Sequence, residues 1–511
     1  MDKMNENHRD NETVPKAWDF DRYFCDDLPT APRPDLGTIL VTGASGYIGG
    51  RLVPELLHRG YRVRIMIRGD TELYKERWPG VEIVVADALN KESLGDALKG
   101  VYAAYYLIHS LLLGPREFEA ADIRAATNFR EVAEKEGVDR IIYLGGLGDS
   151  QTSRSPHLRG RMKVAEQLRA GGVPVTILRA AIIIGSGSSS YEIIRHMVSR
   201  MPVLLIPHWA KNRCQPIGIR DVIKYLVGVL ETPETIGKSF DIGGRDILTY
   251  ELMLKIFADI INKKRIFISA PFLSIRFYSY FASLLTPVPA QIIASLMEGL
   301  KDEVVCGNCE INKYVPFEPL EYRETIIRAL TREEHDIVHT RWSDAYPPAH
   351  VLAMKLHELE GGPIFTASYS LLSEKDEASL FRSICTVGGK TGWFNNNWLW
   401  RARGILDRLL FGVGTARGRR SQSSLNINDV IDFWRVEDLQ PNRLLLLRAE
   451  MKLPGKAWLE FDINQENNKR CLTITAYFHT KSLFGKVYWY IFLPFHRFIF
   501  TDLIEQIEKR S

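Results

Sequence analysis

Short apolar runs alternate with longer amphipathic segments between about residue 37 and residue 180. The runs lack the alternation of a half-exposed strand, as expected when helices cover both faces of a sheet. They span residues 38–41, 62–67, 81–86, 103–108, 140–144 and 175–178. The segments between them predict helices at residues 51–59, 91–98, 118–136 and 161–170. This order predicts an α/β fold built on a doubly wound parallel sheet with right-handed crossovers.

The pattern loosens after Gly185. Further helices are expected at residues 191–200, 221–230, 249–261, 272–285 and 290–300, with a strand at residues 239–242. The last two helices are separated by Thr286-Pro287-Val288-Pro289. We expect this part to form a smaller lid over the carboxyl edge of the sheet.

Beyond the lid the pattern becomes that of antiparallel hairpins. Strands are expected at residues 430–436, 444–451, 457–463 and 472–478, and a final helix at residues 494–509. The chain is therefore divided into an N-terminal tail (1–36), an α/β domain (37–330), a linker (331–350) and a C-terminal α+β domain (351–511). The tail has aromatic residues able to dock it on the body, so complete disorder is not expected; they are Trp18, Phe20, Tyr23 and Phe24. We expect the C-terminal domain to be a curved sheet wrapped round the last helix.

Composition narrows the functional classes. The chain of 511 residues is 45% hydrophobic and 25% charged, with a net charge of +4, which is typical of a soluble globular protein and predicts no nucleic-acid partner. Cys306 and Cys309 lack a second pair at zinc spacing, so no metal is expected.

Membrane and targeting signals are also missing from the sequence. The N-terminus has no signal peptide and no apolar stretch reaches the ~20 residues of a membrane span, so we expect a cytoplasmic protein without stable membrane insertion. The aromatic run at residues 488–500 is assigned to a core helix, because a helix on a membrane surface carries more Lys and Arg.

A glycine-rich turn follows the first predicted strand. Gly43 permits a tight turn, Gly46 leaves room for a diphosphate, and Gly49 lets the next helix pack close to the strand. The spacing is G-x-x-G-x-x-G, preceded by a strand and followed by a helix. Amide groups at the start of that helix are suited to phosphate oxygens, which predicts a dinucleotide site of the Rossmann type.

The end of the second strand bears on which dinucleotide binds. NAD sites place a carboxylate there, whereas this chain has Arg68. A guanidinium matches the oxygens of a 2′-phosphate, so NADP(H) is favoured. NAD(H) stays an alternative because Asp70 follows, and Arg68 as a solvated strand-end residue is the other interpretation.

Several segments together carry a resemblance to a known family. They are Thr42 to Gly49, Val63 to Arg68, Asp87-Ala88, Tyr106 to Ser110, Leu178 to Ala181, Gln215-Pro216-Ile217, Asp221-Val222 and Phe240 to Gly244. Over residues 37–330 the chain resembles the atypical and extended short-chain dehydrogenase/reductase superfamily. The likeness is closer to its NmrA-like branch, which includes the Rossmann accessory subunit of respiratory complex I.

The resemblance implies a cofactor site. Around the diphosphate it implies Gly43, Ser45, Gly46, Tyr47, Ile48 and Gly49, with Arg68 at the 2′-phosphate. It further implies Asp87 and Ala88 at the adenine, Leu107, Ile108 and His109 at the ribose, and Arg179, Ala180, Ala181 and Ile182 at the nicotinamide.

The C-terminal part is similar to a bacterial domain of unassigned function that follows such Rossmann domains. The residues that carry this likeness are Gly392-Trp393, Leu399-Trp400, Arg403-Gly404, Gly418-Arg419-Arg420, Asp432 to Val436 and Tyr488-Trp489-Tyr490. The order of its elements resembles the START-like helix-grip fold, which implies an interior for an apolar ligand.

The catalytic pattern of the superfamily is incomplete here. Its reductases use Tyr-x-x-x-Lys, and Arg159 stands four positions before Lys163 where the Tyr is expected. Arginine stays protonated near neutral pH and donates no proton. Lys163 is a candidate ligand of the ribose hydroxyls. The candidate proton donors are His109 and Tyr143, with His157 as another.

Two hypotheses follow. The first is an NADP(H)-binding oxidoreductase-like protein that acts on or carries an apolar small molecule, such as a quinone-like or polyketide-like compound. The second is a non-catalytic NADPH-binding sensor or assembly protein, for which a respiratory complex or another protein is a candidate partner.

Overall fold

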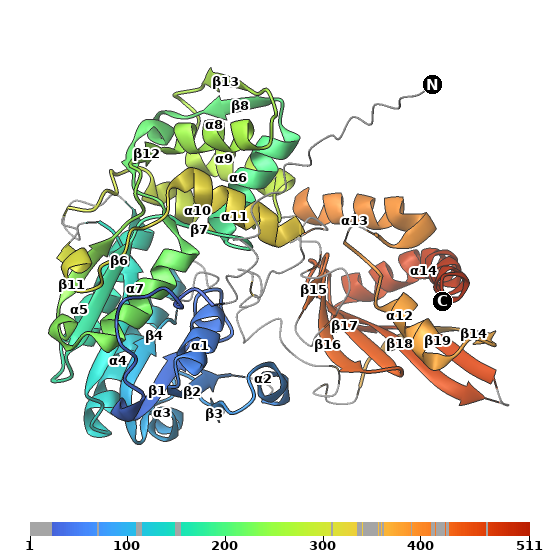
Figure 1. The fold of residues 1–511 in the computed structure, drawn as a ribbon. Helices are drawn as coiled ribbons and strands as arrows, with labels where there is room; N and C mark the ends of the chain where they lie inside the picture. Colours follow the sequence, from blue (N-terminus) through green and yellow to red (C-terminus); the bar gives the residue numbers. More distant parts are fainter. Residues whose placement is uncertain are drawn as a thin grey trace, which may run out of the picture.

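The computed structural model describes most of the chain. The described residues are 23–68, 71–108, 115–148, 155–307, 310–334, 340, 356, 359, 362–389, 391–409, 414, 419, 425, 429–466 and 469–511. Figure 1 shows a parallel-sheet domain with its lid on one side and an antiparallel-sheet domain on the other.

A seven-stranded sheet forms the centre of the first domain. Its strands are β1 (Thr38–Thr42), β2 (Arg62–Ile67), β3 (Glu82–Val85), β4 (Val101–Tyr106), β5 (Arg140–Gly146), β6 (Val175–Ala180) and β11 (Ser239–Ile242). They lie in the order β11-β6-β5-β4-β1-β2-β3, and every neighbouring pair is parallel. This is the predicted doubly wound sheet.

Helices cover both faces of this sheet. They are α1 (Gly49–His58), α2 (Glu72–Arg77), α3 (Lys91–Leu98), α4 (Pro115–Lys135), α5 (Pro156–Arg169) and α7 (Ile219–Glu231). One core cluster joins α1 and α7 to the sheet, and a second joins α3, α4 and α5 to its other face. Burial on both faces explains why the strands show apolar runs without alternation.

The lid has an apolar core of its own. Its elements are β7 (Ile183–Ile184), α6 (Ser189–Arg200), β8 (Val203–Ile206), β9 (Arg213–Cys214), β10 (Ile217–Gly218), β12 (Leu248–Thr249), α8 (Tyr250–Ile260), β13 (Ile266–Ser269), α9 (Ile275–Leu285), α10 (Ala290–Gly299) and α11 (Tyr322–Glu334). Thr249 caps α8, because its side chain accepts the amide of Leu252 at 3.1 Å.

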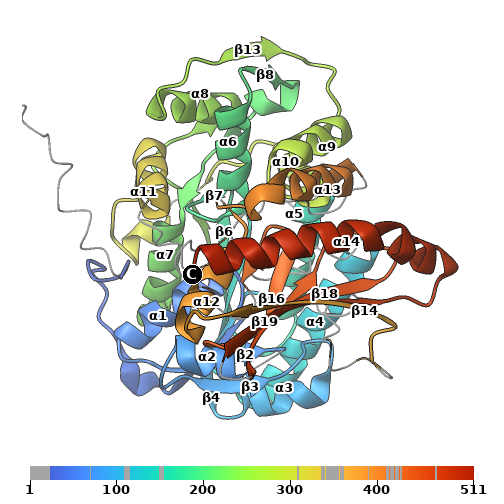
Figure 2. The ribbon, with the colours of Figure 1, turned by 90° about the vertical axis from the view of Figure 1, so that its right-hand side faces the viewer.

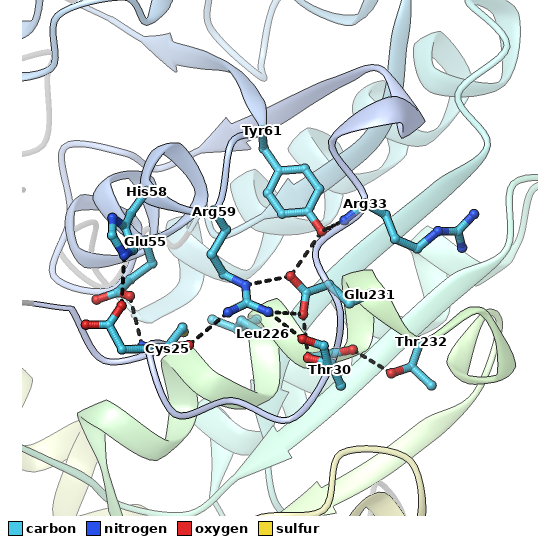
Figure 3. A network of polar contacts seen from close by, with 12 residues as sticks. Cys25, Thr30, Arg33, Glu55, His58, Arg59, Tyr61, Leu226, Glu231 and Thr232 are labelled. Carbon is cyan, nitrogen blue, oxygen red and sulfur yellow. Dashed lines mark hydrogen bonds and ion pairs between the residues drawn. The ribbon is translucent and has the colours of Figure 1, made fainter.

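Residues 23–36 pack against the first domain, whereas the sequence suggested a tail up to residue 36. Phe24 and Cys25 donate their amides to the carboxylate of Glu55 at 2.7 and 3.0 Å. Arg59 forms an ion pair with buried Glu231 at 2.7 Å and donates to the carbonyl of Thr30 at 2.6 Å (Figure 3). Phe24, Cys25 and Leu28 are buried in the core of this domain, so the aromatic residues of the predicted tail were a local signal of docking, whereas the polar partners lie on distant helices.

An antiparallel sheet forms the C-terminal α+β domain. Its elements are β14 (Phe365–Ser373), α12 (Glu377–Ile384), α13 (Asn397–Leu409), β15 (Val430–Ile431), β16 (Trp434–Gln440), β17 (Leu444–Ala449), β18 (Lys456–Glu466), β19 (Lys469–His479) and α14 (Leu483–Lys509). The strand order is β14-β19-β18-β17-β16-β15. The helix α14 lies on the sheet through ring contacts such as Phe365 with Trp489 and Tyr369 with Phe500.

Three predictions about this domain are corrected. The strand expected at residues 430–436 is a hairpin, in which Asp432 adopts φ 55° between β15 and β16. β14 is an additional edge strand that the pattern did not predict. The final helix begins at Leu483 rather than near residue 494, because the side chain of Ser482 accepts the amide of Gly485 at 3.0 Å; Pro494 lies inside the helix.

The aromatic run of α14 is only half a core helix, which is a further correction. Trp489 and Phe500 are buried against the sheet, as expected. Tyr490, Phe495 and Phe498 are exposed on the opposite side of the same helix. Within the described residues, the structure contains no helix long and apolar enough to cross a bilayer.

Candidate functional site

The glycine-rich turn lies where β1 ends and α1 begins. The hydroxyl of Thr42 donates to the carbonyl of Tyr105 at 2.8 Å and accepts the amide of Leu107 at 3.0 Å, which fixes the end of β4 beside the turn. Gly43 has φ +64°, and a Cβ there would lie 2.7 Å from the carbonyl oxygen of Leu107. Glycine is therefore required at this position by both conformation and space.

The next two glycines bring the helix against the turn. Gly46 donates its amide to the carbonyl of Gly43 at 2.9 Å. A Cβ on Gly49 would lie 2.4 Å from the same carbonyl oxygen, so only glycine allows this approach. The amides of Gly50, Arg51 and Leu52 already donate to the carbonyls of Gly46 and Ile48, so the part suited to phosphate oxygens is the turn before α1, at the carboxyl edge of the sheet. The residues present therefore fit a dinucleotide diphosphate.

The residues proposed around the adenosine half are spread along one edge. Arg68 is exposed directly after β2. The carboxylate of Asp87 accepts the amide of Leu89 at 2.9 Å, and Asn128 donates to the carbonyl of Ala88 at 3.1 Å. Asp87 therefore shapes the turn before α3, in addition to any contact with the adenine. Gly69 and Asp70 lie outside the described residues.

The residues proposed around the nicotinamide half lie at the ends of β4 and β6. Leu107 and Ile108 are half-buried after β4. Arg179 forms an ion pair with Asp241 of β11 at 2.7 Å, so its guanidinium is held toward the neighbouring strand. Ala181 and Ile182 are half-buried and pack against the apolar core of the lid. This end of the site therefore has apolar walls.

Of the candidate catalytic residues, the structure describes Tyr143 and Lys163. Tyr143 is fully buried and donates its hydroxyl to the carbonyl of Arg161 at 3.0 Å, and burial raises its pKa. This placement argues against Tyr143 as a proton donor. Lys163 is exposed and forms an ion pair with Glu119 of α4. His109 lies outside the described residues.

Sequence reasoning missed two residues at the start of α1. Thr340, from the segment between the domains, is buried and donates its hydroxyl to the carbonyl of Tyr47 at 3.0 Å. Arg51 donates to the carbonyl of Ser186 at 2.8 Å and to that of Thr340 at 3.2 Å. A Cβ on Gly50 would lie 2.6 Å from Cγ2 of Thr340.

The glycine at position 50 was a signal in the sequence that another group packs closely there. It does not identify that group as Thr340. Thr340 therefore contacts the same turn that carries the candidate diphosphate site. The two predicted domain boundaries treated its segment as a linker only.

Comparison with known proteins assigns the first domain. The NmrA-like family model matches residues 35–308, which is more than half of the chain. The chain belongs to the NmrA-like family. Binding of NAD(P) is typical of this family. A second model, a protein family of unknown function (DUF2867), matches residues 360–503.

Relatives of the NmrA-like domain differ in what their names describe. The chain is 25% identical over 256 residues to the mitochondrial NADH dehydrogenase [ubiquinone] 1 alpha subcomplex subunit 9 of Arabidopsis thaliana, covering 48% of this chain and 63% of that protein. It is 27% identical over 201 residues to a ceramide reductase of Caulobacter vibrioides, covering 39% and 62%. The matches thus span less than two thirds of these relatives.

Solved structures with a similar fold include the triphenylmethane reductase of Citrobacter sp. complexed with NADP(H). It is 20% identical, has a TM-score of 0.47, and the match covers 57% of this chain and 99% of that chain.

Proposed function

We propose that the NmrA-like domain binds NADP(H) at the glycine-rich turn and acts on, or carries, an apolar small molecule. The observation that carries the proposal is the close approach of Gly43 and Gly49, which holds the turn between β1 and α1 at the carboxyl edge of the sheet. Two further features support it: the exposed guanidinium of Arg68 after β2, and the apolar surroundings of Ala181 and Ile182.

The preference for NADP(H) over NAD(H) depends on Arg68. A charge-assisted hydrogen bond to the 2′-phosphate contributes about 1.5–3 kcal/mol, which corresponds to a ten- to hundredfold difference in affinity. Titration of the protein with NADPH and NADH, followed by tryptophan fluorescence, measures this difference.

Arg68→Ala is expected to weaken NADPH binding at least tenfold and to leave NADH binding unchanged. Arg62→Ala is the matched control, because Arg62 is exposed at the opposite end of the same strand. Tighter binding of NADH than of NADPH by the parent protein would overturn the preference.

We propose hydride transfer to a quinone-like or polyketide-like acceptor as the leading activity, with His109 as the candidate proton donor. NADP(H) would supply the hydride. The chain would contribute the orientation of the nicotinamide by Arg179 to Ile182 and contacts to the ribose from Lys163. The test is quinone-dependent oxidation of NADPH by the parent protein and by His109→Ala, with His208→Ala, an exposed lid histidine, as the control.

The second candidate is a non-catalytic NADPH-binding sensor or assembly protein. Arg159 in place of the family Tyr, together with the buried hydroxyl of Tyr143, favours it. The relatives include a respiratory-complex subunit and a photosystem II assembly factor as well as a reductase. Tight NADPH binding without turnover over a broad panel of acceptors would favour this candidate over the enzyme.

For the C-terminal domain we propose that it shields or delivers the apolar ligand, as its likeness to the START-like fold implies. The side of the sheet that faces α14 is filled by aromatic residues, among them Trp393, Phe461 and Phe478. A ligand would therefore have to displace some of these side chains, and a change in their near-UV circular dichroism on addition of a quinone would report it.

A further inference from the structure

The first half of α14 exposes an apolar stripe. Its members are Leu483, Phe484, Val487, Tyr490, Ile491, Phe495 and Phe498, and Phe484 is 72% exposed. Phe484, Ile491 and Phe498 follow each other at intervals of seven residues, and thus share one side of the helix. The opposite side, with Trp489 and Phe500, is buried on the sheet. Solvent-exposed apolar residues in one contiguous stripe mark an interaction surface.

A second helix adds to this surface. On α13, Trp398, Ile405 and Leu409 are exposed at intervals of seven and four residues, and Trp398 is 65% exposed. The buried side of α13 carries Trp400, whose ring lies 6.4 Å from that of Phe500 of α14. Both views show α13 and α14 side by side, and Figure 2 shows them on the side of the domain facing the viewer. We call the exposed residues of the two helices the apolar face.

Along the stripe itself, from Leu483 to Phe498, the charged side chains are all cations, and the first exposed carboxylate of α14, Glu505, lies beyond it. From residue 467 to residue 501 the chain contains no carboxylate, whereas Lys486 and Arg497 are exposed on α14. Lys486, Tyr490 and Arg497 are spaced four and seven residues apart, so the two cations line one border of the stripe. On α13, Arg401 is exposed beside Trp398, and the first carboxylate, Asp407, is buried.

This combination of exposed aromatic rings and bordering cations matches an anionic phospholipid surface. Tyr and Trp rings favour the level of the lipid headgroups, and a Lys or Arg near an anionic surface contributes about 1 kcal/mol. An isolated helix on a membrane surface carries Lys and Arg on the side opposite its apolar residues. That side of α14 is packed on the sheet and does not face water, so cations are not needed there. In a two-fold symmetric dimer, the cations of both chains would lie along one contact and repel each other. This repulsion disfavours a second copy of the chain as the occupant.

We propose that the apolar face of α13 and α14 binds the surface of an anionic phospholipid membrane. The helices would lie on the bilayer and would not cross it, in agreement with the absence of a spanning helix among the described residues. The proposal stands independently of nucleotide binding, since no residue of the glycine-rich turn takes part.

The test is sedimentation of the full chain with vesicles of phosphatidylcholine alone and of phosphatidylcholine with phosphatidylglycerol. We expect the protein to sediment with the anionic vesicles and at least tenfold less with the neutral ones, and high salt to weaken binding. The triple variant F484E/I491E/F498E is expected to stay in the supernatant. The double variant K486E/R497E is expected to lose only the preference for anionic vesicles.

Leu372→Glu is the matched control, because Leu372 is 58% exposed in the same domain, on β14 and on the face of the sheet turned away from α14. It should bind vesicles like the parent, and all variants should keep the parent's thermal midpoint and NADPH titration. Absence of vesicle binding by the parent, or equal binding by the triple variant, would overturn the proposal. A dimer in size-exclusion chromatography that the triple variant dissociates, without vesicle binding, would assign the apolar face to a second copy instead.

Discussion

We propose functional roles for the first residues of both α1 and α14, but the two helices present their functional groups in opposite ways. At α1 the main chain is the functional group, and side chains are excluded: a Cβ on Gly49 would lie 2.4 Å from a carbonyl oxygen. At α14 the side chains are the functional groups, and seven large apolar ones point to solvent. The comparison teaches that a site made of backbone leaves a strict glycine pattern, whereas a surface made of side chains depends on which face is buried.

The largest expected effect is at Gly49. Gly49→Val forces atoms into the carbonyl of Gly43, so we expect a loss of more than about 3 kcal/mol in the unfolding free energy of the first domain, and loss of NADPH binding. Circular dichroism on heating measures this. Gly95→Ala in α3 is the control, because nothing lies within 4 Å of that added Cβ, and it should stabilise the helix slightly. An unchanged midpoint for the Gly49 variant would contradict the close packing.

The next largest effect concerns the buried ion pair between Arg59, which follows α1, and Glu231 at the end of α7. Glu231→Gln leaves the guanidinium of Arg59 without its buried counter-charge and is expected to cost about 3 kcal/mol in unfolding free energy. Chemical denaturation of the full chain measures it. Glu303→Gln, which breaks an exposed ion pair with Arg213, should leave the midpoint unchanged. Equal effects of the two variants would mean that the buried pair of Arg59 and Glu231 contributes no more to stability than an exposed pair.

The stability of the C-terminal domain should depend on pH through His496 of α14. Burial lowers the pKa of His496 to about 4 from its ordinary value of 6.5. Between those values the unfolded chain binds a proton that the folded chain does not. The unfolding free energy therefore falls by ~1.4 kcal/mol for each pH unit as the pH drops from 6.5 towards 4. His496→Phe should flatten this slope and leave the slope above pH 7 as in the parent. The same slope in both proteins would contradict the buried position of His496.

The smallest expected effect is at the contact between Thr340 and the turn before α1. Thr340→Val removes the hydroxyl that donates to the carbonyl of Tyr47, which should cost about 1 kcal/mol and change NADPH affinity by less than tenfold. Thr331→Val is the control, since its hydroxyl bonds within α11. An NADPH affinity that falls a hundredfold only in the Thr340 variant would mean that Thr340 contacts the nucleotide itself.

The parallel sheet and the glycine-rich turn were predictable because their signals are local. Buried strands show apolar runs. Gly43 is required by its φ of +64°, and Gly49 is required by its contact with the carbonyl of Gly43, six residues earlier. The hairpin at Asp432 was not predictable, since a positive φ at a non-glycine residue has no strict sequence mark. Nor were the contact of Thr340 and the polar contacts of residues 23–36, because their partners lie far away in the sequence. The exposed face of α14 escaped prediction because apolar residues surround this helix on nearly all sides, so that only its packing on the sheet separates the buried rings from the exposed ones.

Binding of the nucleotide diphosphate at the glycine-rich turn is tested most directly by a crystal structure of the full chain soaked with NADPH. We expect the diphosphate at the start of α1, within hydrogen-bond distance of main-chain amides between Ser45 and Gly49, with the 2′-phosphate beside Arg68. A nucleotide bound elsewhere, or a turn closed by side chains while NADPH binds in solution, would contradict it.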